Sequence, residues 1–276
     1  MRGKKQRPTS IIALVISFLL LSSYILSQLG IHILPSSSSS SSSSTPLSSE
    51  SIEVPEYKRE AYVTFLSSGP DPEYFTSVRL QLFAIKHDPL TLDPIPRDVV
   101  IITYPSVPKH QCEQLSNEGA IIIPVEEITS IPNPWKDTDD HWRDVLGKLY
   151  VFNMTQYSRV MMLDGDMFLH KSLSGIWQDE HSWPKSGLAA CGDGFAGHEI
   201  PQRNDPPFNS GFMMVVPDED TFEELLEFRD YDHSWMDQAM LNSYFDQNGL
   251  HPWEPLDHKW VCNAPTMADI EFGIAV

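Results

Sequence analysis

Apolar runs and helical repeats alternate along the chain from about residue 59 onward. Four runs with strand composition lie at 61–67, 99–105, 120–128 and 159–163. Apolar residues at helical spacing separate them, at 74–85, 109–118 and 142–152, and Asp139 or Asp140 is a candidate cap for the last of these helices. Strands that alternate with helices predict an α/β fold with a mostly parallel sheet and helices on both of its faces.

The pattern becomes less regular after residue 177. Two further strands are predicted at 187–194 and 208–217, with a long loop rich in Pro and Gly between them. Asp218 is a candidate cap for a helix that turns Phe222 and Leu225 inward, and a last helix covers 235–245. We assign no helix or strand to the residues that follow.

The N-terminal part of the chain follows a different pattern. Residues 1–10 carry four basic side chains, and residues 11–34 contain no Asp, Glu, Lys or Arg. A run of that length can cross the bilayer core, which takes about 20 residues. The basic flank predicts a cytoplasmic N-terminus. We expect a transmembrane signal anchor at 11–34, with a cleaved signal peptide as the alternative; both deliver the rest of the chain to the secretory lumen.

A serine tract separates this run from the folded part. Residues 35–58 include nine consecutive serines and cannot build a core. They are typical of a flexible stem that is open to O-glycosylation. The expected plan is therefore a basic cytoplasmic tail (1–10), an anchor, a stem and one luminal domain over 59–276. This plan predicts a single-pass type II membrane protein and is typical of Golgi processing enzymes.

The charge balance narrows the classes of partner. The chain has 19 Lys and Arg against 38 Asp and Glu, for a formal net charge of −19. Binding to nucleic acid requires a basic surface, so we exclude that class. The acidic excess suits the recruitment of divalent cations, although solubility alone would account for it equally well.

Two features leave their chemistry open. Cys112, Cys191 and Cys262 are odd in number and widely spaced, which gives no zinc motif and allows either one disulfide with a free thiol or three thiols. Asn153-Met154-Thr155 is an N-glycosylation sequon, but it falls in a helix predicted to pack beside the sheet.

Asp164 and Asp166 are the strongest candidates for chemistry. They directly follow the buried strand that ends at residue 163, and ligands bind at the carboxyl ends of parallel strands. In an extended chain the two side chains would point the same way, and Gly165 between them would let a ligand approach the backbone. Paired carboxylates suit Mn²⁺ or Mg²⁺, and such a cation can neutralise a leaving diphosphate.

An Asp-x-Asp tripeptide alone is weak support, because a solvated turn produces it often. A second enzyme class, the haloacid dehalogenase phosphatases, also places Asp-x-Asp after an apolar strand. That motif continues to a Thr two residues after the second Asp, where this chain has Phe168. It also tends to lie near the start of its domain, whereas here three strand-helix units precede it.

Four segments, taken together and in order, resemble glycosyltransferase family 8, the family of glycogenin and galactinol synthase. They are 61–67, 142–177, 208–217 and 237–245. The resemblance implies a GT-A (Rossmann-like) fold and a retaining transfer of a hexosyl group from a UDP-sugar with Mn²⁺. The acceptor, whether glycan, protein or lipid, is unknown, and Mg²⁺ is the second candidate cation.

The resemblance also assigns roles to ten residues. Asp164 and Asp166 would bind the metal. Donor contacts would come from Thr64 and Tyr74 at the uridine, Lys148 at the phosphates, and Asp193, Asn209 and Ser210 at the sugar. Asp237 and Gln238 would flank the reacting carbon, position the sugar and stabilise developing positive charge. The leaving diphosphate would help to deprotonate an acceptor that attacks from the same face.

Simpler interpretations stay open for several of these residues. Lys148 could be a solvated helix lysine, and Asn209 with Ser210 could be a turn that enters a strand. Asp193 could cap a loop, and Asp237 could be a charge favoured by a helix N-terminus.

One departure from the family concerns the metal. Members supply a third ligand, a His late in the chain, but no His follows His258, which comes too early to match. We therefore expect a C-terminally incomplete domain with two protein ligands for the metal. This favours, as an alternative function, a catalytically impaired luminal relative that binds a UDP-sugar or a partner without turnover. A self-glucosylating primer like glycogenin is less favoured, because the anchor places the domain in the lumen.

Overall fold

The computed structural model describes most of the predicted luminal domain. The described residues are 59–67, 72–138, 141–194, 199–200, 205–263 and 265–274. All of them belong to the compact unit Pro55–Val276. The predicted tail, anchor and stem, and both candidate caps at 139 and 140, lie outside the described residues. Within the described part, no helix has the length and apolar character that crossing a membrane would take.

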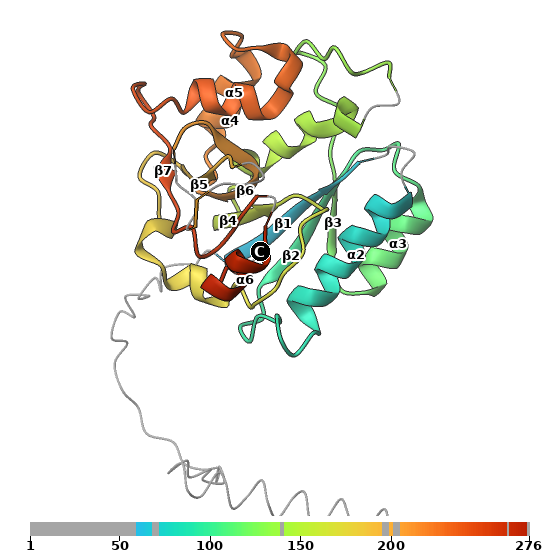
Figure 1. Ribbon diagram of the computed structural model, residues 1–276. Helices are drawn as coiled ribbons and strands as arrows, with labels where there is room; N and C mark the ends of the chain where they lie inside the picture. Colours follow the sequence, from blue (N-terminus) through green and yellow to red (C-terminus); the bar gives the residue numbers. More distant parts are fainter. Residues whose placement is uncertain are drawn as a thin grey trace, which may run out of the picture. The chain divides into compact units, whose positions relative to one another are not determined.

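A seven-stranded sheet forms the centre, in the order β3-β2-β1-β4-β6-β5-β7 (Figure 1). The strands are β1 (Arg59–Leu66), β2 (Asp98–Thr103), β3 (Ile121–Pro124), β4 (Tyr157–Leu163), β5 (Leu188–Gly192), β6 (Phe208–Val215) and β7 (Glu254–Pro255). β6 is antiparallel to β4 and to β5, and the other neighbouring pairs are parallel. The predicted α/β class with a mostly parallel sheet is confirmed.

Helices cover both faces of the sheet, as predicted. One core contains the apolar residues of α2 (Pro72–Lys86) and α3 (Lys109–Asn117), which lie side by side in Figure 1. The other contains those of the 3₁₀ helix η1 (His141–Asn153), of α4 (Glu219–Glu227) and of α5 (Met236–Tyr244). β4 serves both cores, because successive side chains of a strand point to opposite faces. Met161 and Leu163 join the first core, and Val160 and Met162 the second.

Two local predictions need correction. Residues 141–153 form a 3₁₀ helix, and three of its buried apolar residues, Leu146, Leu149 and Phe152, lie three positions apart, which matches 3.0 residues per turn. The C-terminal part, left without elements by the sequence, contains β7 and α6 (Met267–Phe272). The side chain of Asp269 accepts hydrogen bonds from the backbone N–H and the hydroxyl of Thr266, which caps α6. That Thr-x-x-Asp pattern was a usable sequence signal.

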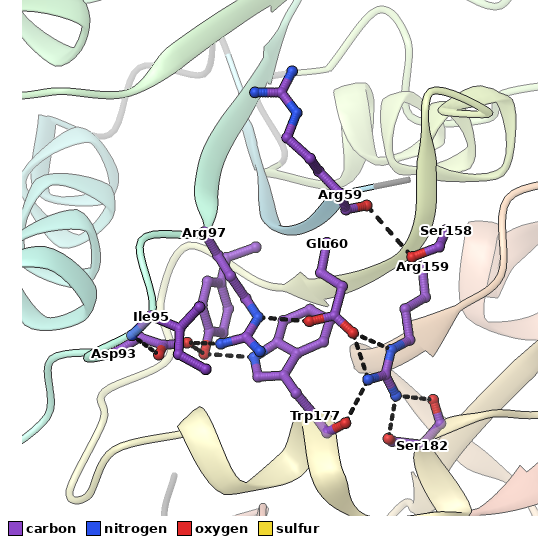
Figure 2. Close-up of polar contacts among 10 residues, drawn as sticks. Arg59, Glu60, Asp93, Ile95, Arg97, Ser158, Arg159, Trp177 and Ser182 are labelled. Atoms are coloured by element: carbon purple, nitrogen blue, oxygen red, sulfur yellow. Dashed lines mark hydrogen bonds and ion pairs between the residues drawn. The ribbon is translucent and has the colours of Figure 1, made fainter. Parts of the chain in front are cut away.

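A buried charge network joins the amino ends of β1 and β4 to the segment that follows Asp93 (Figure 2). Arg159 is 2% exposed, and its Nε donates to Glu60 Oε1 at 2.8 Å. It also donates to the backbone carbonyls of Ser182 and Trp177. Arg97 donates to Glu60 Oε2 at 2.8 Å and to Asp93 Oδ2 at 2.6 Å. Every carboxylate in the network therefore has a cationic partner, which buried charges require.

Gly147 shows how tightly η1 packs on β1. A Cβ at this position would lie 2.7 Å from Cζ of Phe65 and closer still to Cε2. We expect Gly147→Ala to lower the free energy of unfolding by about 1–3 kcal/mol through overpacking, as measured by urea denaturation. The double variant Gly147→Ala/Phe65→Leu should recover part of the loss. Equal stability of Gly147→Ala and the wild type would contradict this packing.

Candidate functional site

A cleft of about 1040 Å³ opens where β1 and β4 end and β6 begins. Its walls come from α2, η1, the segment after β4, and the start of α5. Eight of the ten predicted site residues line it: Tyr74, Lys148, Asp164, Asp166, Asn209, Ser210, Asp237 and Gln238. The sheet therefore brings together residues that lie up to 164 positions apart in the sequence, counted from Tyr74 to Gln238.

Asp164 and Asp166 lie in a tight turn and not in an extended segment. The N–H of Met167 donates to the carbonyl of Asp164 at 3.2 Å, which closes the turn directly after β4. Gln81 donates to the same carbonyl at 2.8 Å. The prediction that extended geometry aligns the two carboxylates is therefore wrong, although both side chains do line the cleft.

Gly165 serves packing and not ligand access. A Cβ there would lie 2.5 Å from Cγ2 of Val78 and 2.9 Å from Cζ of Tyr74. The hydroxyl of Tyr74 accepts from the N–H of Gly165 at 3.2 Å and donates to the carbonyl of Phe65 at 3.2 Å. Side chains of α2 thus fill the space beside this glycine, and the expectation that it opens the backbone to a ligand is wrong. Burial raises the pKa of Tyr74, which keeps the phenol neutral.

Lys148 connects two of the cleft's carboxylates. Its Nζ lies 2.8 Å from Asp237 Oδ2 and 3.2 Å from Asp164 Oδ1. The lysine side chain is only 8% exposed. Burial opposes its charge, but the carboxylates of Asp164 and Asp237 outweigh burial and raise the pKa of the ammonium. Lys148 is therefore a charged, fixed bridge and not a solvated helix lysine.

The cleft as a whole carries excess negative charge. Its described lining includes four carboxylates and one ammonium: Glu73, Asp164, Asp166, Asp237 and Lys148. Burial raises the pKa of Asp164, and the neighbouring Asp237 and Asp166 carboxylates add to that effect against the opposing charge of Lys148. A further cation in the cleft would relieve this repulsion.

The start of β6 and the start of α5 are linked by direct hydrogen bonds. The hydroxyl of Ser210 donates to Asp237 Oδ2 at 2.9 Å, and its N–H donates to Gln238 Oε1 at 3.2 Å. Asp237 is only 5% exposed, and its carboxylate contacts Ser210 and Lys148. The small exposed part of this side chain lines the cleft. These two hydrogen bonds hold Asn209-Ser210 and Asp237-Gln238 together in one site.

Asp193 lies behind the cleft and orients the amides around it. Its Oδ1 accepts from Asn209 Nδ2 at 3.1 Å and from Asn263 Nδ2 at 2.9 Å. Its Oδ2 accepts from Gln238 Nε2 at 2.9 Å. Asp193 itself does not line the cleft. Asn263 was not predicted, because no local pattern marks a residue that reaches across 70 positions.

Thr64 is the second predicted site residue that the structure keeps away from the cleft. It is 3% exposed within β1 and is absent from the cleft lining. Its hydroxyl finds no hydrogen-bond partner among the described residues. The neighbouring Phe65 and Ser67 line the cleft instead.

Tryptophans form one rim of the cleft. Trp142 and Trp235 both line it, with ring centroids 5.7 Å apart, and Trp235 is 59% exposed. Met236 between Trp235 and Asp237 has φ 46°, a region that non-glycine residues rarely adopt. This conformation joins the 3₁₀ helix η4 (His233–Trp235) to α5, and the residues on both sides of it contribute to the cleft.

Other metal and thiol chemistry has little support in the described part of the chain. Within it, no group of three or more His, Cys, Asp or Glu side chains could hold a metal ion. All three cysteines are free thiols, and burial raises the pKa of Cys262 to about 12. Of the two alternatives that the cysteine count left open, the structure has three thiols and no disulfide among them.

Several proteins that are similar in sequence to this chain are named as glucuronosyltransferases. No protein-family model matches it. An uncharacterised protein of Schizosaccharomyces pombe is 23% identical over 266 residues, covering 75% of this chain and 68% of that protein. The putative glucuronosyltransferase PGSIP7 of Arabidopsis thaliana is 29% identical over 200 residues, covering 69% of this chain and 35% of that protein.

A second plant relative is UDP-glucuronate:xylan alpha-glucuronosyltransferase 1 of Arabidopsis thaliana. It is 26% identical over 190 residues, covering 68% of this chain and 25% of that protein. The chain thus spans only about a quarter to a third of these plant proteins.

Two solved structures of glycosyltransferases superpose on part of this chain. Mouse xyloside xylosyltransferase 1 in its apo form has a TM-score of 0.45 and 13% identity, and covers 75% of this chain and 88% of its own. The galactosyltransferase LgtC with donor and acceptor sugar analogues has a TM-score of 0.44 and 13% identity, and covers 72% and 74%.

Proposed function

We propose that the protein is a glycosyltransferase that moves a hexosyl group from a UDP-sugar to an acceptor within the cleft. The observation that carries the proposal is the convergence of the Asp-Gly-Asp turn, Lys148, Ser210 and Asp237 at the carboxyl end of one sheet. The relatives named as glucuronosyltransferases support it and make UDP-glucuronate the first donor to test. The family 8 resemblance supports a GT-A fold and retention at the anomeric carbon.

The cleft's donor set fits a divalent cation at Asp164 and Asp166. Mg²⁺ is usually held by one or two carboxylates together with substrate phosphates, and Mn²⁺ takes similar oxygen ligands. A nucleotide diphosphate would add negative charge to a cleft that already has four carboxylates and one ammonium. A bound Mn²⁺ or Mg²⁺ would supply charge neutralisation of the leaving diphosphate.

The chain's own residues would hold the donor sugar and its charges. Lys148 keeps Asp164 and Asp237 at fixed positions through its two ion pairs. Asp237 would then face the anomeric carbon and stabilise positive charge as it develops, while Gln238 positions the sugar. Asp193 holds the amides of Gln238 and Asn209, and so acts as a positioning residue behind them. Trp142 and Trp235 would shield the reacting centre from water.

A second function has support from one observation. Within the described residues, no group of three or more His, Cys, Asp or Glu side chains is arranged to hold a metal ion. This favours a catalytically impaired relative that binds a UDP-sugar or a partner without turnover. For both functions we propose luminal placement in a secretory-pathway membrane, supported by the basic tail and the uncharged run at 11–34.

A panel of UDP-sugars distinguishes the two functions. The purified full chain is incubated with each donor and Mn²⁺, and UDP release and donor binding are measured in parallel. We expect UDP release from at least one donor, lost after EDTA and restored by Mn²⁺. Binding without release would favour the impaired relative. Neither binding nor release with any donor would contradict both the transferase and a relative that binds a UDP-sugar without turnover.

A further inference from the structure

The sequon Asn153-Met154-Thr155 lies at the exposed end of η1. Asn153 is the last residue of η1, and both Asn153 and Thr155 are exposed. The helix packs inward through Val151 and Phe152, which are 0% and 1% exposed. Asn153 thus belongs to the helix predicted to pack beside the sheet, but the side chains that an N-glycosylating enzyme must reach are directed to the surface.

The backbone around the sequon forms an accessible turn. The N–H of Met154 donates to the carbonyl of Val151 at 3.4 Å, and the N–H of Tyr157 donates to the carbonyl of Met154 at 2.9 Å. Met154 is 4% exposed and anchors the turn in the core, with Gln156 exposed beyond it. Neither the side chain of Asn153 nor that of Thr155 has a hydrogen-bond partner among the described residues, so modification disrupts no contact found there.

A groove beside Asn153 offers room for a sugar. It has a volume of about 390 Å³, and Ile123, Pro124, Tyr150 and Gln156 are among its lining residues, together with Asn153 itself. Its lining combines apolar side chains with polar tips, which suits a ring that has apolar faces and hydroxyl edges. The groove shares no lining residue with the donor cleft. A glycan at Asn153 can therefore coexist with a bound donor.

We propose that Asn153 is an N-glycosylation site and that the innermost sugar of its glycan lies in this groove. In the reaction Asn153 Nδ2 attacks the anomeric carbon of an oligosaccharide linked to a lipid diphosphate. The new bond joins nitrogen and carbon, and the bond from that carbon to the diphosphate oxygen breaks. The lipid diphosphate leaves with the electron pair, and one amide proton passes to a base of the cell's oligosaccharide transferase. The inference rests on the proposed luminal placement and not on transferase activity of this chain.

Three variants of the full chain test the site. The chain is expressed in cells whose secretory pathway performs N-glycosylation, and its mass is compared before and after treatment with a peptide N-glycosidase. We expect the wild type to lose mass, and Asn153→Gln and Thr155→Ala to be insensitive to the enzyme. Thr155→Ser keeps the sequon and should lose mass like the wild type. Sensitivity of Asn153→Gln to the enzyme would contradict the assignment.

Protease protection of intact microsomes separates the two ways in which the proposal can fail. A wild-type domain that is protected but carries no glycan would overturn Asn153 as an acceptor. A domain that protease digests would overturn luminal placement and the glycosylation with it. Because groove and cleft are separate, enzymatic removal of the glycan should leave UDP release within about twofold of the untreated protein, and a larger loss would contradict their separation.

Discussion

Asp164→Asn is expected to lower metal-dependent UDP release by about a hundredfold or more. A metal that stabilises charge at a leaving diphosphate contributes several kcal/mol, and each 1.4 kcal/mol is a factor of ten. Asparagine preserves shape, and the hydrogen bond from Gln81 to the backbone carbonyl at 164 stays possible. Lys148 keeps Asp237 as its partner at 2.8 Å, so the fold should persist. The loss is measured as the rate of UDP release at saturating Mn²⁺.

Asp230→Asn is the matched control for this change. Asp230 is an exposed carboxylate that does not line the cleft. Its loss should leave UDP release unchanged, which shows that the effect at Asp164 does not come from net charge. Undiminished turnover of Asp164→Asn in Mn²⁺ would remove Asp164 from the metal site.

Arg159→Met should cost about 3–5 kcal/mol in the free energy of unfolding, because breaking a buried ion pair leaves its partners unsatisfied. Arg159 is 2% exposed and donates to Glu60 and to the carbonyls of Ser182 and Trp177 (Figure 2). Methionine replaces the aliphatic stem but none of these donors. Glu60 retains Arg97, which favours the lower end of the range. Urea denaturation measures the change.

Arg59→Met provides the comparison within the same region. Arg59 pairs with Asp98 at 3.4 Å, but its side chain is 73% exposed. An exposed pair of this kind contributes less than about 1 kcal/mol. If Arg159→Met and Arg59→Met lowered the free energy of unfolding equally, burial would not explain the contribution of the Arg159 contacts to stability.

The periodic patterns of the sequence predicted most of the fold. The apolar runs at 61–67, 99–105 and 159–163 became β1, β2 and β4, and α2 was found where apolar residues recur at helical spacing. These elements are long enough for burial to repeat several times, which makes their pattern specific. β7, with two residues, and α6, with six, are too short for such repetition.

The position of the candidate site followed from strand order, but its internal contacts did not. A run that ends in Asp164 predicts a carboxylate at the ligand edge of a parallel sheet. The turn after Leu163, the filling of the space beside Gly165 by Tyr74, and the bridge from Lys148 to Asp237 depend on how separate helices pack. No local pattern encodes such contacts.

Long-range polar partners were the least predictable part. The carboxylate of Asp193 accepts hydrogen bonds from the side-chain amides of Asn209, Gln238 and Asn263. Arg159 pairs with Glu60, which lies 99 positions earlier in the chain. Nothing in their own stretches of sequence marks Asn263, Arg159 or Glu60, and the resemblance that singled out Asp193, Asn209 and Gln238 did not predict that they bind one another. Their roles come from tertiary burial, which requires every buried polar group to find a partner.

The central claim is that a divalent cation at Asp164 and Asp166 holds a nucleotide diphosphate in this cleft. Calorimetric titration of UDP into the full chain tests it most directly, with Mn²⁺ present and after its removal by EDTA. We predict binding of one UDP per chain in Mn²⁺, with affinity reduced by about tenfold or more after EDTA and in Asp164→Asn. Equal affinity with and without the metal, or no binding of UDP in Mn²⁺, would contradict the claim.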